Sequence, residues 1–236
     1  MKNLIVALDL PTAEQALALV DQLGEPADYY KVGAQLFTRA GPTLVSELRE
    51  RGKRVFLDLK YHDIPHTVAR AVEAAAELDV AMLTLHASGG ATMMRAARDA
   101  IGTDGPLLVG VTLLTSFTAA DVEELWDKQL RSLREEVSRL AGIAADAGLD
   151  GVVASALEVE GLKRRHGADF VVVTPGIRPT GEVEDDQART ATPTDAVRAG
   201  ADYLVVGRPL HRAEDPAAVL EQILDEITVA EGAGEE

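Results

Sequence analysis

The sequence predicts an α/β fold, a single-domain (β/α)8 TIM barrel over residues 1–229. Short β-branched runs alternate with longer helical patterns, which gives eight strand–helix units in 236 residues without a break in composition. Several strands are apolar on both faces, as parallel strands covered by helices are. The alternative is a doubly wound open sheet, but the turn Leu8-Asp9-Leu10-Pro11-Thr12 lacks the glycine-rich dinucleotide fingerprint.

The strands are predicted where short apolar runs are bounded by turn or charged residues. They are residues 4–8, 29–32, 54–59, 82–86, 107–113, 151–154, 170–174 and 203–206.

The helices are predicted between these strands from the helical spacing of apolar residues. Thr12 begins the first helix as a capping residue, with Gln15 three residues later and Gly24 at the end. The later helices are expected over 35–51, after Pro65, after Gly89-Gly90, once or twice within 119–147, and over 156–165, 194–199 and 216–227. Thr194-Asp195 and Asp215-Pro216 look like helix starts. Residues 230–236 are expected to form a disordered acidic tail.

Composition limits the classes of partner and the compartment. The net charge is −16, so we expect neither nucleic acid nor a membrane as a partner, and a phosphate ligand would need a local positive site. The absence of cysteine excludes disulfides and thiolate chemistry and fits a reducing compartment. The N-terminus lacks the pattern of a signal peptide, and no run approaches the ~18 apolar residues of a membrane span. We therefore expect a cytoplasmic protein.

The most informative segment is Asp58-Leu59-Lys60-Tyr61-His62-Asp63, which follows the apolar run Val55-Phe56-Leu57. Side chains alternate along a strand, so Asp58 and Lys60 are expected on one face, about 6–7 Å apart along the chain. Charges at the end of a buried strand are rare unless they are paired or used in chemistry.

Other polar residues also fall at the predicted strand ends, where barrel active sites form. They are Asp9, Lys31, His86, Thr115, Ser116, Ser155, Arg178 and Arg208. Any one of them alone fits a solvated loop or a helix cap. The convergence of two lysines and three aspartates on one barrel mouth instead predicts a catalytic site, because each charge there must be matched.

The loops after the seventh and eighth strands predict a phosphate site. Arg178 follows one strand and Gly207-Arg208 the other, and these loops recurrently bind phosphate in such barrels. The long polar loop 180–193 between Arg178 and Thr194 is expected to act as a lid.

Three histidines carry weaker signals. His62 and His66 are four residues apart, but Pro65 lies between them, so we favour surface or helix-start histidines over metal ligands. His86 ends a strand, where it either lines the barrel mouth or is buried in the core. No metal site is predicted.

Together these residues resemble the orotidine 5′-monophosphate decarboxylase family. The resemblance rests on Asp58-x-Lys60-x-x-Asp63-Ile64-Pro65-x-Thr67 and extends over almost the whole chain. It also includes the segments 6–9, 31–33, 114–116, 175–179 and 206–209. The family resemblance implies a cofactor-independent carboxy-lyase that converts orotidine 5′-monophosphate to UMP in pyrimidine biosynthesis.

The resemblance also implies residue roles. Lys60 would protonate C6, and Asp58 would lie against the substrate carboxylate. The other implied substrate contacts are Asp9 and Lys31 on the ribose, Thr115 and Ser116 on the pyrimidine, and Arg178, Gln187, Gly207 and Arg208 on the 5′-phosphate. Asp63 and Thr67 would reach the neighbouring subunit's site, which implies a homodimer with shared active sites.

Two other functions remain open from the sequence. One is a Mg²⁺-dependent sugar-phosphate decarboxylase or aldolase of the same superfamily, such as 3-keto-gulonate-6-phosphate decarboxylase. Those enzymes resemble this chain in the Asp-x-Lys-x-x-Asp motif. They typically place a glutamate near the end of the second strand, where this chain has Lys31. A cation at this position opposes Mg²⁺ binding. The other is a non-catalytic phosphate-binding barrel, which would not need an aligned set of Asp and Lys residues.

Overall fold

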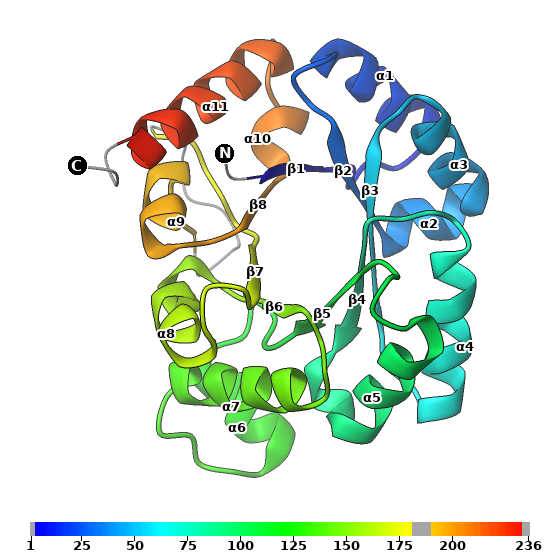
Figure 1. Cartoon of the computed structure of the whole chain (residues 1–236). Coiled ribbons are helices and arrows are strands. Elements are labelled where there is room, and N and C mark those ends of the chain that lie inside the picture. Colours follow the sequence, from blue (N-terminus) through cyan, green and yellow to red (C-terminus); the bar gives the residue numbers. More distant parts are fainter. Residues whose placement is uncertain (1–2, 181–189, 233–236) are drawn as a thin grey trace.

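The strands close into one parallel barrel surrounded by helices (Figure 1). This computed structural model describes residues 3–180 and 190–232. Each strand pairs with the next along the chain, and β1 closes the ring against β8 in the register Asn3↔Tyr203 to Val6↔Val206. The predicted (β/α)8 barrel is therefore confirmed. The doubly wound alternative is wrong, because an open sheet would leave two unpaired edges.

All eight predicted strands are present, with small differences at their ends. They are β1 (Asn3–Ala7), β2 (Tyr29–Gly33), β3 (Arg54–Tyr61), β4 (Met82–His86), β5 (Leu107–Val111), β6 (Gly151–Val153), β7 (Val171–Thr174) and β8 (Tyr203–Val206). The bounds of β4 and β8 are those predicted. β3 continues to Tyr61, beyond the expected end at residue 59, and this extension carries Lys60.

The helices lie between the strands, with two of the predicted capping residues in place. They are α1 (Ala13–Leu23), α2 (Ala34–Ala40), α3 (Pro42–Glu50), α4 (Pro65–Ala76), the short 3₁₀ helix η1 (Ala87–Gly89), α5 (Gly90–Ile101), α6 (Ala119–Trp126), α7 (Leu133–Asp146), α8 (Ala156–His166), α9 (Pro193–Ala199), α10 (Arg208–His211) and α11 (Pro216–Gly232). Thr12 caps α1 by accepting a hydrogen bond from the Gln15 N–H at 3.3 Å. Asp215 caps α11 by accepting one from the Ala218 N–H at 3.1 Å.

The single helix predicted over 35–51 is wrong. The chain instead forms α2 and α3, which are separated at Gly41-Pro42. Gly41 adopts φ 63°, in the left-handed region, and Pro42 has no N–H to continue the hydrogen bonds of α2. Apolar spacing continues across this break, so periodicity alone does not reveal it.

Two further differences from the predicted helices lie near the barrel mouth. Helix α9 begins at Pro193 rather than Thr194, because Thr192 is the capping residue and accepts from the Asp195 N–H at 3.1 Å. The sequence analysis also missed α10, a four-residue helix directly after β8. Pro209 lies in its first turn, where proline is tolerated because that N–H has no partner within the helix.

The C-terminal helix is longer than predicted. It runs to Gly232, past the expected end at residue 227 and into the segment 230–236 that was expected to be disordered. Ala230 is only 4% exposed, so packing against the barrel extends the helix beyond the limit that composition indicates. Residues 233–236 lie outside the described part. Among the helices of the described residues, none is both long and apolar enough to cross a membrane.

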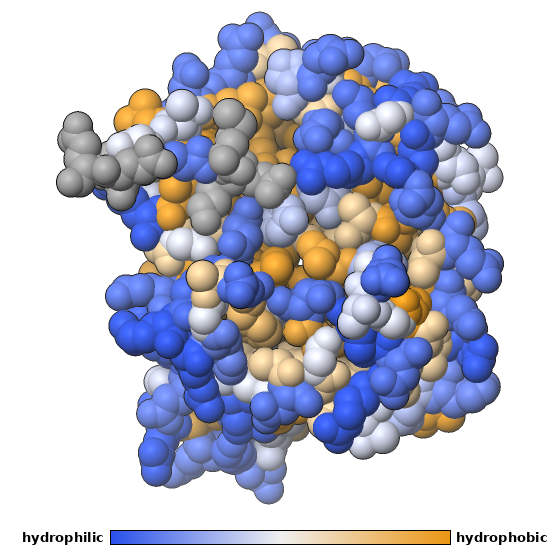
Figure 2. Space-filling view, viewed as in Figure 1, coloured by the Kyte–Doolittle hydropathy of each residue, from blue (hydrophilic) through white to orange (hydrophobic). Residues whose placement is uncertain are grey.

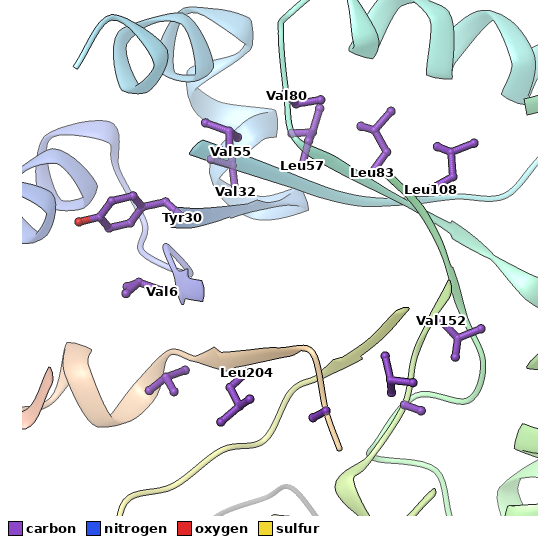
Figure 3. Packing of buried hydrophobic residues seen from close by; sticks show 14 of the residues in the cluster. Val6, Tyr30, Val32, Val55, Leu57, Val80, Leu83, Leu108, Val152 and Leu204 are labelled. Atoms are coloured by element: carbon purple, nitrogen blue, oxygen red, sulfur yellow. The ribbon is translucent and has the colours of Figure 1, made fainter. Parts of the chain in front are cut away.

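The core has two layers. Apolar side chains reach the surface at the centre of the ring, with hydrophilic residues around them (Figure 2). Inside the barrel, Tyr29, Phe56 and Met82 pack with smaller residues from the other strands. A larger outer layer fills the space between strands and helices, and Figure 3 shows members such as Val55 and Leu83 pointing from their strands toward it. This packing fixes the strand ends, which carry the charged residues.

Candidate active site

Asp58 lies between two lysines at the end of the barrel interior. Its Oδ2 is 2.6 Å from Nζ of Lys60 and 3.5 Å from Nζ of Lys31. The side chains of Asp58 and Lys31 are each 10% exposed, whereas that of Lys60 is 37% exposed. Lys60 is thus the member of this group that is most open to a bound molecule.

Asp9 extends the same series of charges. Its Oδ1 accepts a hydrogen bond from Nζ of Lys31 at 2.7 Å. Gly33, two residues after Lys31 on β2, lies directly beneath this pair. A Cβ at Gly33 would be 2.9 Å from Asp9 Oδ1 and 3.2 Å from Lys31 Nζ. The glycine therefore provides the space in which the ion pair forms.

The charges alternate in sign along this series, which we call the charged row: Asp9, Lys31, Asp58 and Lys60. Burial of an unpaired charge is very costly. The two inner members, Lys31 and Asp58, each have a neighbour of opposite sign on both sides, so neither is buried unpaired. Asp9 follows the end of β1, Lys31 lies on β2, and Asp58 and Lys60 lie on β3, and the barrel brings these three strands side by side.

The pKa values of the two inner members shift in opposite directions. Burial of Lys31 favours its neutral form, but the carboxylates of Asp58 and Asp9 outweigh burial and raise the pKa of Lys31. Burial likewise favours neutral Asp58, yet Lys31 and Lys60, together with the hydroxyl of Thr84, lower the pKa of Asp58. Both groups are therefore ionised at neutral pH.

The backbone of β3 is irregular where it carries these residues. Its pairing with β4 passes from Leu57↔Leu83 to Tyr61↔Leu85, so four steps along β3 correspond to two along β4. Within this bulge Lys60 adopts φ 51°, a left-handed conformation that costs a non-glycine residue about 1–2 kcal/mol. Asp58 and Lys60 meet as predicted, but simple alternation along a regular strand is the wrong reason.

Thr84 on β4 holds this bulge. Its Oγ1 accepts a hydrogen bond from the Lys60 N–H at 2.9 Å and donates one to Asp58 Oδ1 at 2.9 Å. The residue is fully buried. The sequence analysis missed Thr84, although a hydroxyl within the apolar run Met82–His86 is a signal that could have singled it out.

The charged row borders a cavity of about 240 Å³ at the carboxyl ends of the strands. Its remaining walls are mainly apolar, with Thr115 as a polar contact. They are formed by Phe56, Val111, Leu113, Leu114, Thr115, Val153, Val173, Pro175 and Val205. Ser116, the other predicted pyrimidine contact, is exposed and does not border the cavity. A few polar groups aimed into an apolar cavity are typical of a small-molecule site.

Asp63 and Thr67 do not border the cavity of their own chain. Both are exposed, and Asp63 Oδ1 accepts a hydrogen bond from the Ile64 N–H at 2.6 Å. Ile64 between them is 66% exposed, so a large apolar side chain faces solvent beside both residues. The structure therefore separates these two predicted site residues from the charged row.

The predicted phosphate ligands follow β7 and β8. The Arg178 N–H donates to the carbonyl of Ala191 at 2.9 Å, so the two ends of the loop between β7 and α9 are tied together. Arg208 begins α10 immediately after Gly207, and a Cβ at Gly207 would be 3.3 Å from Cβ of Ala7. Gln187, the remaining predicted contact, lies outside the described residues.

The other polar residues at the strand ends have structural partners. Ser155 caps α8 by accepting from the Leu157 N–H at 3.3 Å. The rings of His62 and His86 lie 5.4 Å apart, and burial, followed by the proximity of His62 and Lys60, lowers the pKa of His86. Among the described residues, no three His, Cys, Asp or Glu side chains form a group suited to a metal ion.

Comparison with known proteins assigns the family of this chain. Residues 2–223 match the model of the orotidine 5′-phosphate decarboxylase / HUMPS family. Two relatives named orotidine 5′-phosphate decarboxylase are similar over almost their full length. The one from Sodalis glossinidius is 51% identical, covering 94% of this chain and 89% of the relative, and the one from Actinobacillus succinogenes is 52% identical, covering 94% and 96%.

A solved structure agrees with these relatives. The crystal structure of orotidine 5′-phosphate decarboxylase from Lactobacillus acidophilus superposes with a TM-score of 0.85 at 39% identity. It covers 96% of this chain and 99% of that protein. The match in length means that the barrel, the cavity and the charged row all lie within the shared region.

Proposed function

The chain belongs to the orotidine 5′-phosphate decarboxylase / HUMPS family, and on this premise we propose that the cavity beside the charged row is where orotidine 5′-monophosphate loses CO2 to give UMP. This decarboxylation, a step of pyrimidine biosynthesis, is the reaction of the chain. The family model carries both the orotidine 5′-phosphate decarboxylase and the HUMPS name, but relatives at about 50% identity over nearly the whole chain are named orotidine 5′-phosphate decarboxylase.

One observation carries the mechanism: Lys60 is partly exposed beside the cavity, whereas its partner Asp58 and the neighbouring Lys31 are buried. Loss of CO2 leaves an electron pair on C6 without an adjacent group to delocalise it. A fixed ammonium group stabilises this developing negative charge and then donates a proton to C6. Asp58, 2.6 Å from Nζ of Lys60, orients the ammonium group. Lys60 is therefore the proposed catalytic acid.

Asp58 has a second proposed role. Its charge is held by Lys31, Lys60 and Thr84, so it stays ionised while it is buried. A substrate carboxylate bound against this fixed anion is repelled, and the repulsion disappears as CO2 leaves. Binding energy from distant parts of the substrate has to offset this repulsion.

The 5′-phosphate is the distant group that we propose supplies that energy. Arg178 and Arg208, on the loops after β7 and β8, are suited to charge-assisted hydrogen bonds with its oxygens, and Gly207 allows close approach of the backbone. Gln187, which lies outside the described residues, is the remaining proposed phosphate contact. Asp9 and Lys31 would bind the ribose hydroxyls, and Thr115, which borders the cavity, would contact the pyrimidine together with Ser116.

We propose that the active unit is a homodimer with shared sites. Asp63 and Thr67 are exposed and separate from their own cavity, and the apolar side chain of Ile64 lies exposed between them. A partner subunit that covers this segment would bury Ile64 and place Asp63 beside the partner's charged row.

Subunit mixing tests the shared site. Asp58→Ala and Asp63→Ala variants, each inactive alone, should regain activity when mixed, because a hybrid dimer holds one site with both aspartates. Two differently tagged copies of a single variant, mixed in the same way, control for the exchange procedure. Hybrid dimers that form but stay inactive would refute sharing.

The reaction is proposed to need no cofactor. Lys31 places a cation 3.5 Å from Asp58, which opposes binding of a divalent metal by the same carboxylate. The purified protein should therefore deplete orotidine 5′-monophosphate, followed as loss of orotate absorbance, at the same rate with and without EDTA. No turnover would reject the proposed function, and activity abolished by EDTA would favour the Mg²⁺-dependent sugar-phosphate enzymes of the family.

A further inference from the structure

Thr84 occupies an unusual place in the barrel. Its neighbours Leu83 and Leu85 belong to the outer apolar layer, so Thr84, between them on β4, faces the barrel interior. It is fully buried and does not border the cavity. A polar side chain in such a position needs hydrogen-bond partners, and it has no direct access to a bound substrate.

The hydroxyl of Thr84 has two partners, and both belong to the segment that carries the chemistry. It accepts from the Lys60 N–H and donates to Asp58 Oδ1, each at 2.9 Å. A hydroxyl has one proton to donate, and the Lys60 N–H directs that proton toward Asp58 by occupying a lone pair. The two contacts therefore orient each other.

Both contacts compensate for the irregularity of β3. The bulge removes Lys60 from the regular pairing with β4, so its N–H requires a side-chain acceptor. The left-handed φ of Lys60 persists only where the surroundings enforce it. Because the side chain of threonine is stiff about χ1, its hydroxyl is a well-defined anchor for the bulge.

We propose that Thr84 is a positioning residue for decarboxylation, which fixes the Asp58 carboxylate and the Lys60 backbone in one geometry through a single hydroxyl. This inference rests on the proposed function of Lys60 and Asp58. Thr84 acts through these two residues and does not contact the substrate.

Kinetics of matched variants test the proposal. Thr84→Val keeps the shape but removes both hydrogen bonds, so kcat should fall about 10–100-fold while KM changes less than about 3-fold. Thr84→Ser keeps the hydroxyl and should stay within about 3-fold of the wild-type kcat. The control is Thr174→Val, the same substitution at a fully buried threonine at the end of β7, which should leave kcat unchanged.

The pH profile adds a readout that a purely structural role would not move. The charged groups around Asp58 are Lys31 from β2, Lys60 from β3, Asp9 after β1 and His86 on β4, and all of them remain in Thr84→Val. Loss of the hydroxyl alone should destabilise ionised Asp58, so the acid limb of kcat should move to higher pH.

The possible outcomes distinguish failure of the proposed function from failure of the inference about Thr84. A wild-type protein without turnover would reject the proposed function. Turnover in the wild type together with a wild-type kcat in Thr84→Val would overturn this inference alone, as would a Thr84→Ser variant as impaired as Thr84→Val. If circular dichroism shows that Thr84→Val is unfolded, the comparison of Thr84→Ala with Thr84→Ser replaces it, and equal kcat values there would also overturn the inference.

Discussion

Nζ of Lys60 lies 2.6 Å from Oδ2 of Asp58, across an irregular stretch of β3. The pair lies where β3 bulges and Lys60 adopts φ 51°. Asp58 is buried, while Lys60 is partly open to the cavity in which we propose that the substrate binds.

Replacing Lys60 tests the proposed proton donor. Lys60→Ala should lower kcat for orotidine 5′-monophosphate by about 10²–10⁴-fold, the range typical for removal of a general acid. Steady-state kinetics measure the loss. Arg164→Ala, on the exposed face of α8, serves as a control that should retain wild-type kcat. A Lys60→Ala variant within tenfold of wild type would contradict the assignment.

The pH dependence of folding tests the lowered pKa of Asp58. A carboxylate whose folded pKa is depressed adds stability above its unfolded pKa of about 3.9, and this stability is lost as pH falls through the folded value. The free energy of unfolding of wild type relative to Asp58→Asn should therefore be constant from about pH 5 to 7 and should decrease below about pH 4.

Urea denaturation at each pH measures this difference. Glu160→Gln is the control, because the Glu160 side chain is 81% exposed and its replacement should leave the free energy of unfolding unchanged over the same range. A wild-type advantage that grows as the pH falls below 4 would show that Asp58 is not preferentially ionised in the folded state.

Gly33→Ala tests whether the space beneath Asp9 and Lys31 matters. The new Cβ would be 2.9 Å from Asp9 Oδ1 and 3.2 Å from Lys31 Nζ, and both atoms are ends of flexible side chains. The fold should therefore tolerate the change, while the charged row shifts and kcat/KM falls about tenfold or more.

Melting temperature and kinetics together separate these effects. Gly161→Ala on α8, where an added Cβ meets nothing within 4 Å, is the matched control and should leave kcat/KM unchanged. Wild-type kcat/KM in Gly33→Ala would mean that the ion pair of Asp9 and Lys31 adjusts without consequence.

Two buried threonines near the barrel mouth provide a paired stability test. The Thr174 hydroxyl is buried without a hydrogen-bond partner within the described part of the chain, whereas the Thr112 hydroxyl donates to the carbonyl of Val153 at 2.9 Å. Thr174→Val should raise the free energy of unfolding by about 1 kcal/mol, and Thr112→Val should lower it by about 1 kcal/mol. Thermal or urea denaturation measures both, and changes of the same sign would contradict this account.

The sequence by itself determined the barrel and the approximate position of its strands and most of its helices. The spacing of apolar residues is a local property of the sequence. It identifies a helix even where the predicted boundary is wrong, as at Gly41-Pro42 or at the end of α11. The sequence also placed Asp58, Lys60 and Lys31 at strand ends, because the carboxyl ends of parallel barrel strands meet on one side.

Only the tertiary structure decided which of these residues touch. Thr84 is separated from Asp58 by 26 positions, and Lys31 from Asp9 by 22, so no local pattern relates them. The bulge in β3 depends on the register with β4, which is set by packing across the whole barrel. Local periodicity therefore fixes the side of the barrel that carries the charges, whereas the register between strands fixes the distances on which their chemistry depends.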